Sequence, residues 1–288
     1  MKTRFLATLI ATLSITQLNC GAATPTIASV DAGDAAVSRD PQASYLQLKD
    51  LTFKELMTGL SIAPVSGDPN VGAHDTLVRL VAGASLPSHF YTNAQNGFLL
   101  DGVLEQPTPS NQSNVVTMTA GSAFYFPAKA EHTSRCAAGK DCLFLVHQDA
   151  AFDFVPNTVP VAADKVPQNP DAKFVLPSSL VYDVVMAGAV EMSTVRGDRA
   201  TGAHNTVIRV AAGAALPSHY YTNEMRGIVL TGPLEQPAPA NESAPASLVL
   251  GSFFKFAAKL PHGTTCRATT PCIFYVHQPG PFDLVTTE

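Results

Sequence analysis

The sequence lacks several features by which large classes of protein are recognised. Its 288 residues carry a net charge of −5 and only 14% charged residues, so it offers no basic face for nucleic acid or an anionic membrane. It contains no Gly-x-Ser-x-Gly elbow and no phosphate-cradling glycine loop. No long stretch follows a helical period. These absences argue against a nucleic-acid binder, a hydrolase with that serine elbow and a phosphate-loop protein.

Long apolar runs are also scarce, and the run near the start is too short to span a bilayer. A basic start at Lys2 and Arg4 precedes an apolar core at residues 5–15, and a small-residue cleavage site ends at Ala23. We therefore expect residues 1–23 to be a secretory signal peptide. The expected location is secreted or periplasmic, with no integral membrane segment after signal cleavage.

Cysteine is scarce too, with five residues in the chain. Cys20 raises the alternative of a lipoprotein anchor, but the residues before it are not the small ones that lipoprotein processing prefers. After cleavage of the signal, four cysteines remain, in two pairs with five intervening residues each: Cys136 and Cys142, Cys266 and Cys272. In an exported protein these pairs predict two short disulfides. The alternative is a thiol metal site, which usually has two intervening residues and a second pair nearby.

The sequence does contain an internal repeat. Residues 83–102 return as residues 213–232, and His219 follows His89 by 130 residues. The four paired cysteines and all eight histidines obey this offset. The histidine pairs are His74 and His204, His89 and His219, His132 and His262, and His147 and His277. The repeat predicts two copies of one histidine-bearing unit, and these units are where we expect the function to lie.

Composition divides the chain, and short strand-like runs fill its two halves. The expected division is a disordered lead-in at 24–40, a first domain at 41–156, a linker at 157–171 and a second domain at 172–288. Runs rich in β-branched and aromatic residues, such as 76–81 and 206–210, are separated by clusters of Gly, Pro and Asn. Many short strands with frequent turns predict an all-β sandwich or closed barrel.

The spacing within each copy resembles the two sequence motifs of the cupin superfamily. The first copy matches at Gly83, His89, Tyr91, Gln95 and Gly102, then at Gly121, Pro127 and His132. The second copy matches at Gly213, His219, Tyr221, Met225 and Gly232, then at Gly251, Ala257 and His262. Within the cupins the chain looks most like the family described as domain of unknown function 4437. The resemblance implies an all-β fold of two tandem cupin (RmlC-like jelly-roll) β-barrels that arose by internal duplication.

The resemblance also implies a divalent metal ion inside one or both barrels, with Fe, Mn, Ni and Zn not distinguished. Cupins bind it through two histidines and a glutamate of the first motif and one histidine of the second. In this chain Tyr91 and Tyr221 replace the second histidine, and Gln95 and Met225 replace the glutamate. Glu224 precedes Met225, and we expect a loop to present it as a substitute, which favours the second barrel. The expected metal ligands are His89, His132, His219, Glu224 and His262.

Other residues are candidates for additional ligands or substrate contacts. The four further histidines are each present in both copies, with hydrogen-bonded histidines at a barrel rim as the alternative. Two arginines offer an anchor for a carboxylate inside a barrel, with a surface pairing to Glu105 or Glu235 as the alternative. The full set is His74, Tyr91, Gln95, His147, His204, Tyr221, His277, Arg79 and Arg209.

These features predict an exported bicupin that binds a small molecule and a divalent metal ion. The alternative is a metal-dependent cupin enzyme, such as a dioxygenase, lyase or isomerase, acting on a small organic substrate. A third hypothesis is a structural or partner-binding pair of barrels. The sequence assigns no catalytic residue. The expected partner is a small-molecule ligand or substrate and not a nucleic acid, while the oligomeric state, including a homo-oligomer, is left open.

Overall fold

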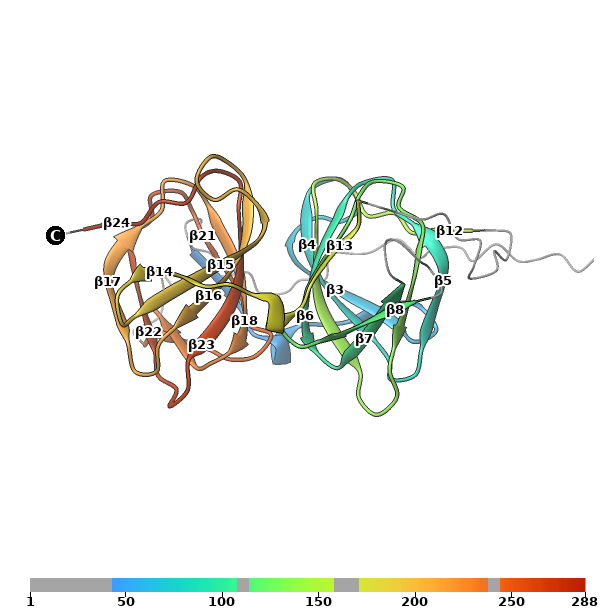
Figure 1. The fold of residues 1–288 in the computed structure, drawn as a ribbon, viewed down its shortest axis with the longest axis horizontal. Coiled ribbons are helices and arrows are strands. Elements are labelled where there is room, and N and C mark those ends of the chain that lie inside the picture. Colours follow the sequence, from blue (N-terminus) through green and yellow to red (C-terminus); the bar gives the residue numbers. More distant parts are fainter. Residues whose placement is uncertain (1–42, 108–113, 158–170, 238–243, 288) are drawn as a thin grey trace, which may run out of the picture.

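The computed structural model describes residues 43–107, 114–157, 171–237 and 244–287, so the expected signal peptide and lead-in and most of the expected linker lie outside the described residues. It contains two barrels side by side, each built from a seven-stranded and a five-stranded antiparallel sheet (Figure 1). This is the all-β tandem arrangement that the resemblance implies. The described helices are two short 3-10 turns, η1 (Leu48–Asp50) and η3 (Pro177–Ser179). None of the described helices has the length and apolar character to cross a membrane.

The first barrel follows the predicted strands closely. Its seven-stranded sheet has the order β13 (Lys173–Val175), β9 (Ala123–Phe126), β6 (Gln95–Asp101), β11 (Cys142–Gln148), β4 (His74–Leu80), β3 (Leu60–Gly67) and β2 (Lys54–Met57). Its five-stranded sheet has the order β12 (Val155–Pro156), β5 (Ser85–Phe90), β10 (His132–Cys136), β7 (Val103–Pro107) and β8 (Val115–Thr119).

The second barrel repeats this topology. Its seven-stranded sheet has the order β1 (Ala43–Leu46), β21 (Phe253–Phe256), β18 (Met225–Thr231), β23 (Cys272–Gln278), β16 (His204–Val210), β15 (Val190–Gly197) and β14 (Asp183–Met186). Its five-stranded sheet has the order β20 (Ala246–Leu248), β19 (Leu234–Gln236), β22 (His262–Cys266), β17 (Ala215–Tyr220) and β24 (Val285–Thr286).

The two barrels exchange their edge strands. Strand β1, at the start of the expected first domain, pairs with β21 of the second barrel. Strand β13, at the start of the expected second domain, pairs with β9 of the first barrel. Each strand covers a sheet edge that would otherwise present unpaired backbone groups. We keep the division of the chain at residues 157–171 as a proposal, with the addition that one strand crosses in each direction.

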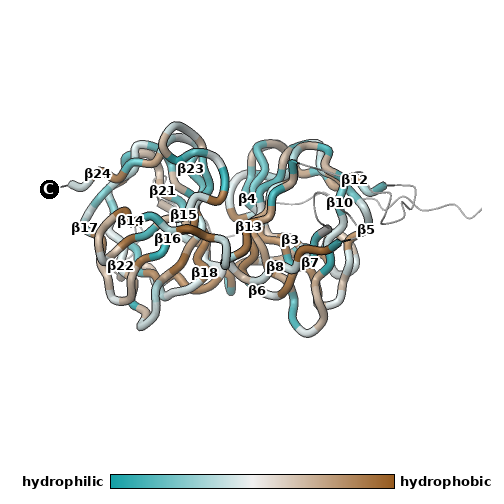
Figure 2. Tube along the Cα trace, in the orientation of Figure 1, coloured by the Kyte–Doolittle hydropathy of each residue, from teal (hydrophilic) through white to brown (hydrophobic). Residues whose placement is uncertain are grey.

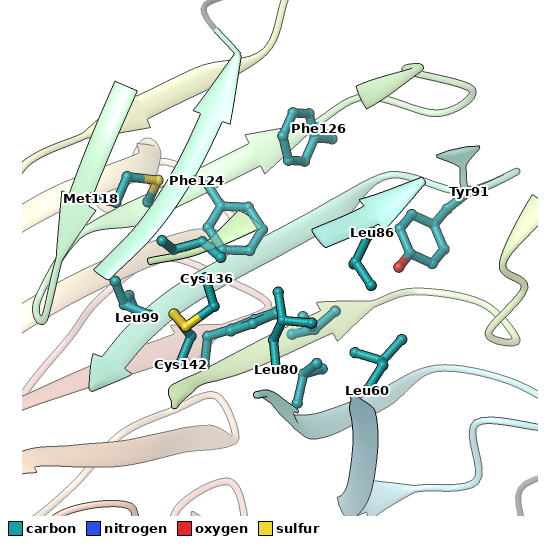
Figure 3. Close-up of a cluster of buried hydrophobic side chains, with 14 of the residues drawn as sticks. Leu60, Leu80, Leu86, Tyr91, Leu99, Met118, Phe124, Phe126, Cys136 and Cys142 are labelled. Atoms are coloured by element: carbon teal, nitrogen blue, oxygen red, sulfur yellow. A yellow bond between two sulfur atoms is a disulfide. The ribbon is translucent and has the colours of Figure 1, made fainter. Parts of the chain in front are cut away.

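The interior of the first barrel is packed with large apolar side chains, several of which Figure 3 shows around Leu80 and Phe124. Alternate residues of each strand face this interior, as the two-residue period of a strand requires. The Cys136–Cys142 disulfide packs into the same cluster, and Cys266–Cys272 takes the equivalent place in the second barrel. Both predicted disulfides are therefore present.

A third apolar cluster joins the barrels. It includes Leu77 and Phe98 of the first barrel and Ile228 and Tyr275 of the second. The rings of Phe98 and Tyr275 are stacked with their centroids 4.7 Å apart. In Figure 2 the segments around β6 and β18 that meet in the middle of the molecule are largely hydrophobic. Because neighbouring residues of these strands face opposite sides, one face fills a barrel and the other forms this interface.

Candidate functional site

A pair of histidines lies across two strands inside each barrel. In the first barrel His89 on β5 and His132 on β10 are directly opposite in the antiparallel ladder, with ring centroids 4.3 Å apart. In the second barrel His219 on β17 and His262 on β22 are paired in the same way, with centroids 4.5 Å apart. Four of the predicted site residues therefore lie together as two facing pairs, and their role as metal ligands stays a prediction.

The backbone fixes which nitrogen of each ring carries the proton. The Nδ1–H of His89 donates to the carbonyl oxygen of Pro87, and that of His132 donates to the carbonyl of Ala130, both at 2.8 Å. The corresponding bonds of the second pair, to Pro217 and Leu260, are 2.8 and 2.9 Å long. A carbonyl can only accept, so each neutral ring has its proton on Nδ1 and a free lone pair on Nε2.

Burial keeps these four rings uncharged at neutral pH. It lowers the pKa of His132 and of His262 to about 4. In each case the hydrogen bond to a backbone carbonyl opposes this shift and raises the pKa. Burial also lowers the pKa of His89, and the neighbouring His132 lowers it further. Burial lowers the pKa of His219 as well. An imidazole in a low-dielectric interior cannot charge without losing the solvation of the cation. Each barrel thus presents two neutral imidazoles with Nε2 as a hydrogen-bond acceptor or metal ligand.

The first pair opens on a small cavity inside the barrel. The space open to the centre of a water-sized sphere is about 20 Å³, enough for a water molecule or one small group of a ligand. Its lining has no Asp, Glu, Lys or Arg. The polar lining residues are Thr76, His89, Tyr91, Gln95, Gln106, His132 and Ser134. The cavity is therefore polar but uncharged.

The other polar groups of the cavity are held in place. Gln106 and Ser134 are hydrogen-bonded to one another, with the Gln106 Nε2 atom 2.8 Å from the Ser134 hydroxyl. Burial raises the pKa of Tyr91 far above its usual range, although a hydrogen bond to the Gln95 side chain opposes the shift. Tyr91 is consequently a protonated phenol, and Figure 3 shows its ring beside Leu86. It can donate a hydrogen bond but is not poised to act as a base.

The second barrel retains only part of this set. Gln236 and Thr264 repeat the buried hydrogen bond, with Thr264 Oγ1 3.1 Å from Gln236 Oε1. Tyr221 is buried and its pKa is raised by burial, as for Tyr91. Met225 is buried in the position of Gln95, so an apolar thioether replaces a side-chain amide. The Nε2 atom of His262 is buried and has no hydrogen-bond partner among the described residues.

More buried polar atoms without partners lie on β4 and β11. His74 pairs with Gln148 in the ladder, and Thr76 follows two positions along on the same face. Within the described residues, His74 Nε2, Thr76 Oγ1 and both amide atoms of Gln148 have no partner. His204, Thr206 and Gln278 repeat this pattern atom for atom in the second barrel. Such atoms are rare in proteins unless water or a ligand satisfies them.

Glu224 is not part of the histidine site, and the prediction that it supplies a metal ligand is wrong. Its carboxylate lies 2.9 Å from Lys255 Nζ and 3.2 Å from Arg226 Nε, outside the barrel. The reason is strand alternation, because Met225 faces the interior and its neighbours Glu224 and Arg226 face away. The preference for the second barrel as the metal site has no remaining support.

His147 and His277 also lie outside the barrels. Their rings stack on one another across the interface, with centroids 4.3 Å apart. His147 Nδ1 is 2.9 Å from Asp75 Oδ1, and Asp75 Oδ2 is 2.9 Å from the Arg226 guanidinium. His147 and His277 are therefore not ligands inside a barrel. They lie at the interface between the barrels and not at a barrel rim.

Arg79 and Arg209 likewise point away from the interior. The Arg79 guanidinium lies 4.1 Å from the centroid of the Phe53 ring. The Arg209 guanidinium lies 3.9 Å from that of Tyr182 and forms an ion pair with Glu191. The predicted carboxylate anchor inside the barrels is therefore wrong, as is the alternative pairing with Glu105 and Glu235, which pair with Arg135 and Arg267.

Comparison with known proteins agrees with this architecture. The model of the family described as "Domain of unknown function (DUF4437)" matches residues 64–285. The chain belongs to the DUF4437 family. Among curated proteins there is no significant match to this DUF4437 protein.

Solved structures similar to this DUF4437 protein include bicupin oxalate decarboxylases. Oxalate decarboxylase from Lactobacillus farciminis, in a formate complex, has 13% identity and a TM-score of 0.60 over 84% of this chain and 88% of that one. A candidate dioxygenase from Nostoc punctiforme has 13% identity and a TM-score of 0.65 over 86% and 88%. AerE from Microcystis aeruginosa has 14% identity and a TM-score of 0.55 over 80% and 96%. The tandem cupin fold is thereby confirmed, and identities this low carry the fold alone.

The donor set of this DUF4437 protein does not fit the metal site that the cupin fold implies. The two imidazoles of each pair suit a divalent ion, and their carbonyl-bound Nδ1 atoms are typical of metal-bound histidines. The other positions hold a protonated phenol and either an amide or a thioether. Among the described residues no three His, Cys, Asp or Glu side chains gather in a way that could hold an ion. A carboxylate, which oxygen-preferring ions such as Mn²⁺ favour, is missing from the cavity.

Sequence reasoning named Gln95 but missed the other buried glutamines, Gln106 and Gln148 with their counterparts in the second barrel. Gln106 and Gln236 obey the offset of 130 residues, as do Gln148 and Gln278. A polar residue that recurs in both copies of a duplicated, mostly apolar barrel strand is a signal for an inward polar group. The same signal applies to Ser134, which is matched by Thr264.

Proposed function

We propose that the first barrel binds a small, uncharged organic molecule that carries hydroxyl groups, at the His89–His132 pair. The observation that carries this proposal is the pair of neutral imidazoles whose Nε2 lone pairs are left free by the carbonyl-bound Nδ1 atoms. Two acceptors side by side suit two hydroxyl donors of one ligand. The buried amides of Gln95 and Gln106 add both donors and acceptors.

The absence of charge in the cavity lining supports a neutral ligand. An isolated carboxylate moved into such a site would lose its hydration without gaining a cation, which costs several kcal/mol at least. The similar structures include an oxalate decarboxylase in complex with formate, so a small carboxylic acid is the ligand that analogy would suggest. The lining favours its neutral counterparts, such as diols and hydroxyketones, over the anions themselves.

The small volume supports a ligand that enters with one polar end. Phe152 lines the cavity and is itself partly exposed. One small polar group of the ligand fills the cavity, where the buried Thr76 hydroxyl has no partner among the described residues, and the rest of the ligand requires side chains such as Phe152 to move. We propose a weaker or less polar ligand for the second barrel, because Met225 removes one hydrogen-bonding group.

The test is a thermal-shift titration with neutral and charged compounds of matched size. Ethylene glycol, 1,2-propanediol and hydroxyacetone are compared with lactate and oxalate at constant ionic strength, in the wild type, His132→Leu and the surface control Arg267→Ala. The proposal expects the neutral compounds to raise the melting temperature of the wild type and of Arg267→Ala more than that of His132→Leu. Equal shifts in all three proteins, or larger shifts with the carboxylates, would refute it.

A second candidate function is catalysis with a divalent ion bound at one histidine pair. The specific observation in its favour is that each pair exposes two unprotonated Nε2 atoms, as metal-bound histidines do. Addition of Mn²⁺, Fe²⁺, Ni²⁺ or Zn²⁺ tests the premise of this candidate, since a tight, His89-dependent stabilisation by any of these ions supports a metal site and no stabilisation removes it.

We further propose that the protein is exported. The two disulfides support an oxidising compartment, and the basic and apolar start of the sequence supports a cleaved signal. Mass determination of the protein isolated from its own host tests this. The expected mass begins at Thr24 and includes two disulfides, whereas a lipid on Cys20 or an uncleaved start would contradict cleavage after Ala23.

A further inference from the structure

The interface between the barrels carries two matching rows of side chains. Register across five strands of the first barrel aligns Asp75, His147, Asn96, Tyr125 and Lys173. Register across five strands of the second barrel aligns Asn205, His277, Arg226, Lys255 and Ser44. The rows face each other, with the His147–His277 stack in the middle. On one side of the stack Asp75 meets Arg226, and on the other Asn205 donates to Asn96 at a distance of 3.2 Å.

On the Asp75 side the cations are neutralised by carboxylates of the protein. Arg226 pairs with Asp75 and Glu224, and Lys255 pairs with Glu224. The hydrogen bond and charge of His147, together with Arg226, hold the pKa of Asp75 below its usual value despite burial, which opposes this. The positive charges on this side are therefore neutralised within the protein, and no external anion is needed.

The Asn205 side has cations of its own but has lost the carboxylates. Asn205 stands where the other half has Asp75, and Ala94 stands where it has Glu224. Arg196 lies with its guanidinium 3.2 Å from the centroid of the Tyr125 ring, and Lys173 is opposite Tyr125 in the ladder. Among the described residues, neither Arg196 nor Lys173 has a carboxylate within ion-pair distance.

These cations border a pocket between the barrels. The space open to the centre of a water-sized sphere is about 150 Å³, comparable with a cavity that holds a six-membered ring. Its polar lining residues are Arg196, Lys173, Asn96, Asn205, Tyr125 and Tyr275. The Asn96 amide oxygen accepts from Asn205, which leaves the Asn96 NH₂ group free to donate. Val175, Val195 and Ala123 supply apolar walls.

From this geometry we infer that the pocket between the barrels binds a small organic anion, with its carboxylate at Arg196 and Lys173 and its apolar body against Val175 and Val195. The bound carboxylate occupies the role that Asp75 and Glu224 play in the other half. The guanidinium is already oriented by its contact with Tyr125, so little side-chain freedom is lost on binding. The inference is independent of the ligand proposed for the barrel interior.

The test uses benzoate and butyrate as probes, with benzyl alcohol as the neutral counterpart of benzoate and inorganic phosphate as an anion without an apolar body. Affinities are measured by NMR line broadening and calorimetry on the full chain. We expect benzoate to bind more tightly than benzyl alcohol or phosphate. Lys173→Ala, Arg196→Ala and Asn205→Asp are each expected to weaken benzoate about tenfold or more, since a charge-assisted hydrogen bond is lost or a carboxylate already fills the site.

Arg267→Ala is the matched control, because it removes an exposed cation that pairs with Glu235 far from the pocket. Its benzoate affinity is expected to equal that of the wild type. Lys173 is exposed, so Lys173→Ala is informative even if Arg196→Ala fails to fold. The inference is overturned if benzyl alcohol binds as tightly as benzoate, if Arg267→Ala weakens benzoate as much as Lys173→Ala, or if no probe binds. Preferential binding of phosphate would overturn the organic part of the inference.

Discussion

The two barrels are copies of one unit, and they differ least at the histidine pairs and most in what surrounds them. His89 with His132 and His219 with His262 share strand register, carbonyl-bound Nδ1 atoms and lowered pKa values. Beside these pairs the first barrel has the amide of Gln95, where the second has the thioether of Met225. On the interface an ion pair on one side is matched by an amide–amide hydrogen bond on the other. Both copies therefore keep the paired imidazoles, while the groups that surround them differ.

Arg226→Ala is expected to cause the largest loss of stability, and this loss distinguishes the Asp75 side of the interface from the Asn205 side. The change leaves the buried carboxylate of Asp75 without its cation, and breaking a buried ion pair costs about 3 kcal/mol or more. Asn96→Ala, at the equivalent position of the first barrel, removes a neutral hydrogen bond and is expected to cost about 1 kcal/mol. Urea unfolding measures both. Equal costs would mean that the two sides of the interface are energetically alike.

Acidification is expected to destabilise the protein by a similar amount through His132 and through His262. The folded-state pKa of His132 and of His262, about 4, lies below the ordinary value of 6.5, so the unfolded chain takes up protons first as pH falls. Their stabilising contribution is complete above pH 6.5 and is lost progressively down to pH 4. Between pH 7 and pH 5 each is expected to cost about 2 kcal/mol.

Unfolding of the wild type, His132→Gln and His262→Gln at pH 7 and pH 5 checks this expectation. Each variant should show about 2 kcal/mol less pH dependence than the wild type. A smaller change in only one variant would show that the corresponding pair is solvated. His147 has the opposite sign, because Asp75 raises its pKa against the effect of burial, and its contribution is lost as pH rises through that value.

Removal of either disulfide is expected to have the same, moderate effect. Each bridge joins cysteines six positions apart, and a short loop gains little from closure, so Cys136→Ser with Cys142→Ser should cost about 2 kcal/mol at most. Cys266→Ser with Cys272→Ser should match it within error. Thermal unfolding of both double variants makes the comparison, and a much larger loss from one pair would show that its bridge supports packing beyond its own loop.

The smallest and most specific effect is expected from exchanging the residues that differ inside the barrels. Gln95→Met gives the first barrel the interior of the second, and removing one hydrogen bond should weaken the best neutral ligand about fivefold. Met225→Gln should strengthen binding to the second barrel by a similar factor. Calorimetric titration of both variants tests this. An unchanged affinity in both would show that this position does not contact the ligand.

Most of the fold, and the positions of the histidine pairs, could be predicted from the repeat in the sequence. It located the facing histidines and the disulfides, because a duplicated unit must repeat its inward positions. Strand alternation would also have placed Glu224 outside once Met225 was taken as inward, and Arg79 outside once Val78 was taken as inward. The exchange of β1 and β13 between barrels had no local signal, since it depends on how the two barrels meet. The stacking of His147 on His277 was hidden for the same reason.

The protonation state of His89 and His132 decides whether the first barrel presents two neutral hydrogen-bond acceptors. Long-range ¹H–¹⁵N correlation on protein labelled at histidine, assigned with His89→Gln and His132→Gln, reports the tautomer of each ring. We expect neutral rings with the proton on Nδ1 at pH 7, and Nε2 signals that move when 1,2-propanediol is added. A charged imidazolium at pH 7, or a proton on Nε2 of either ring, would contradict it.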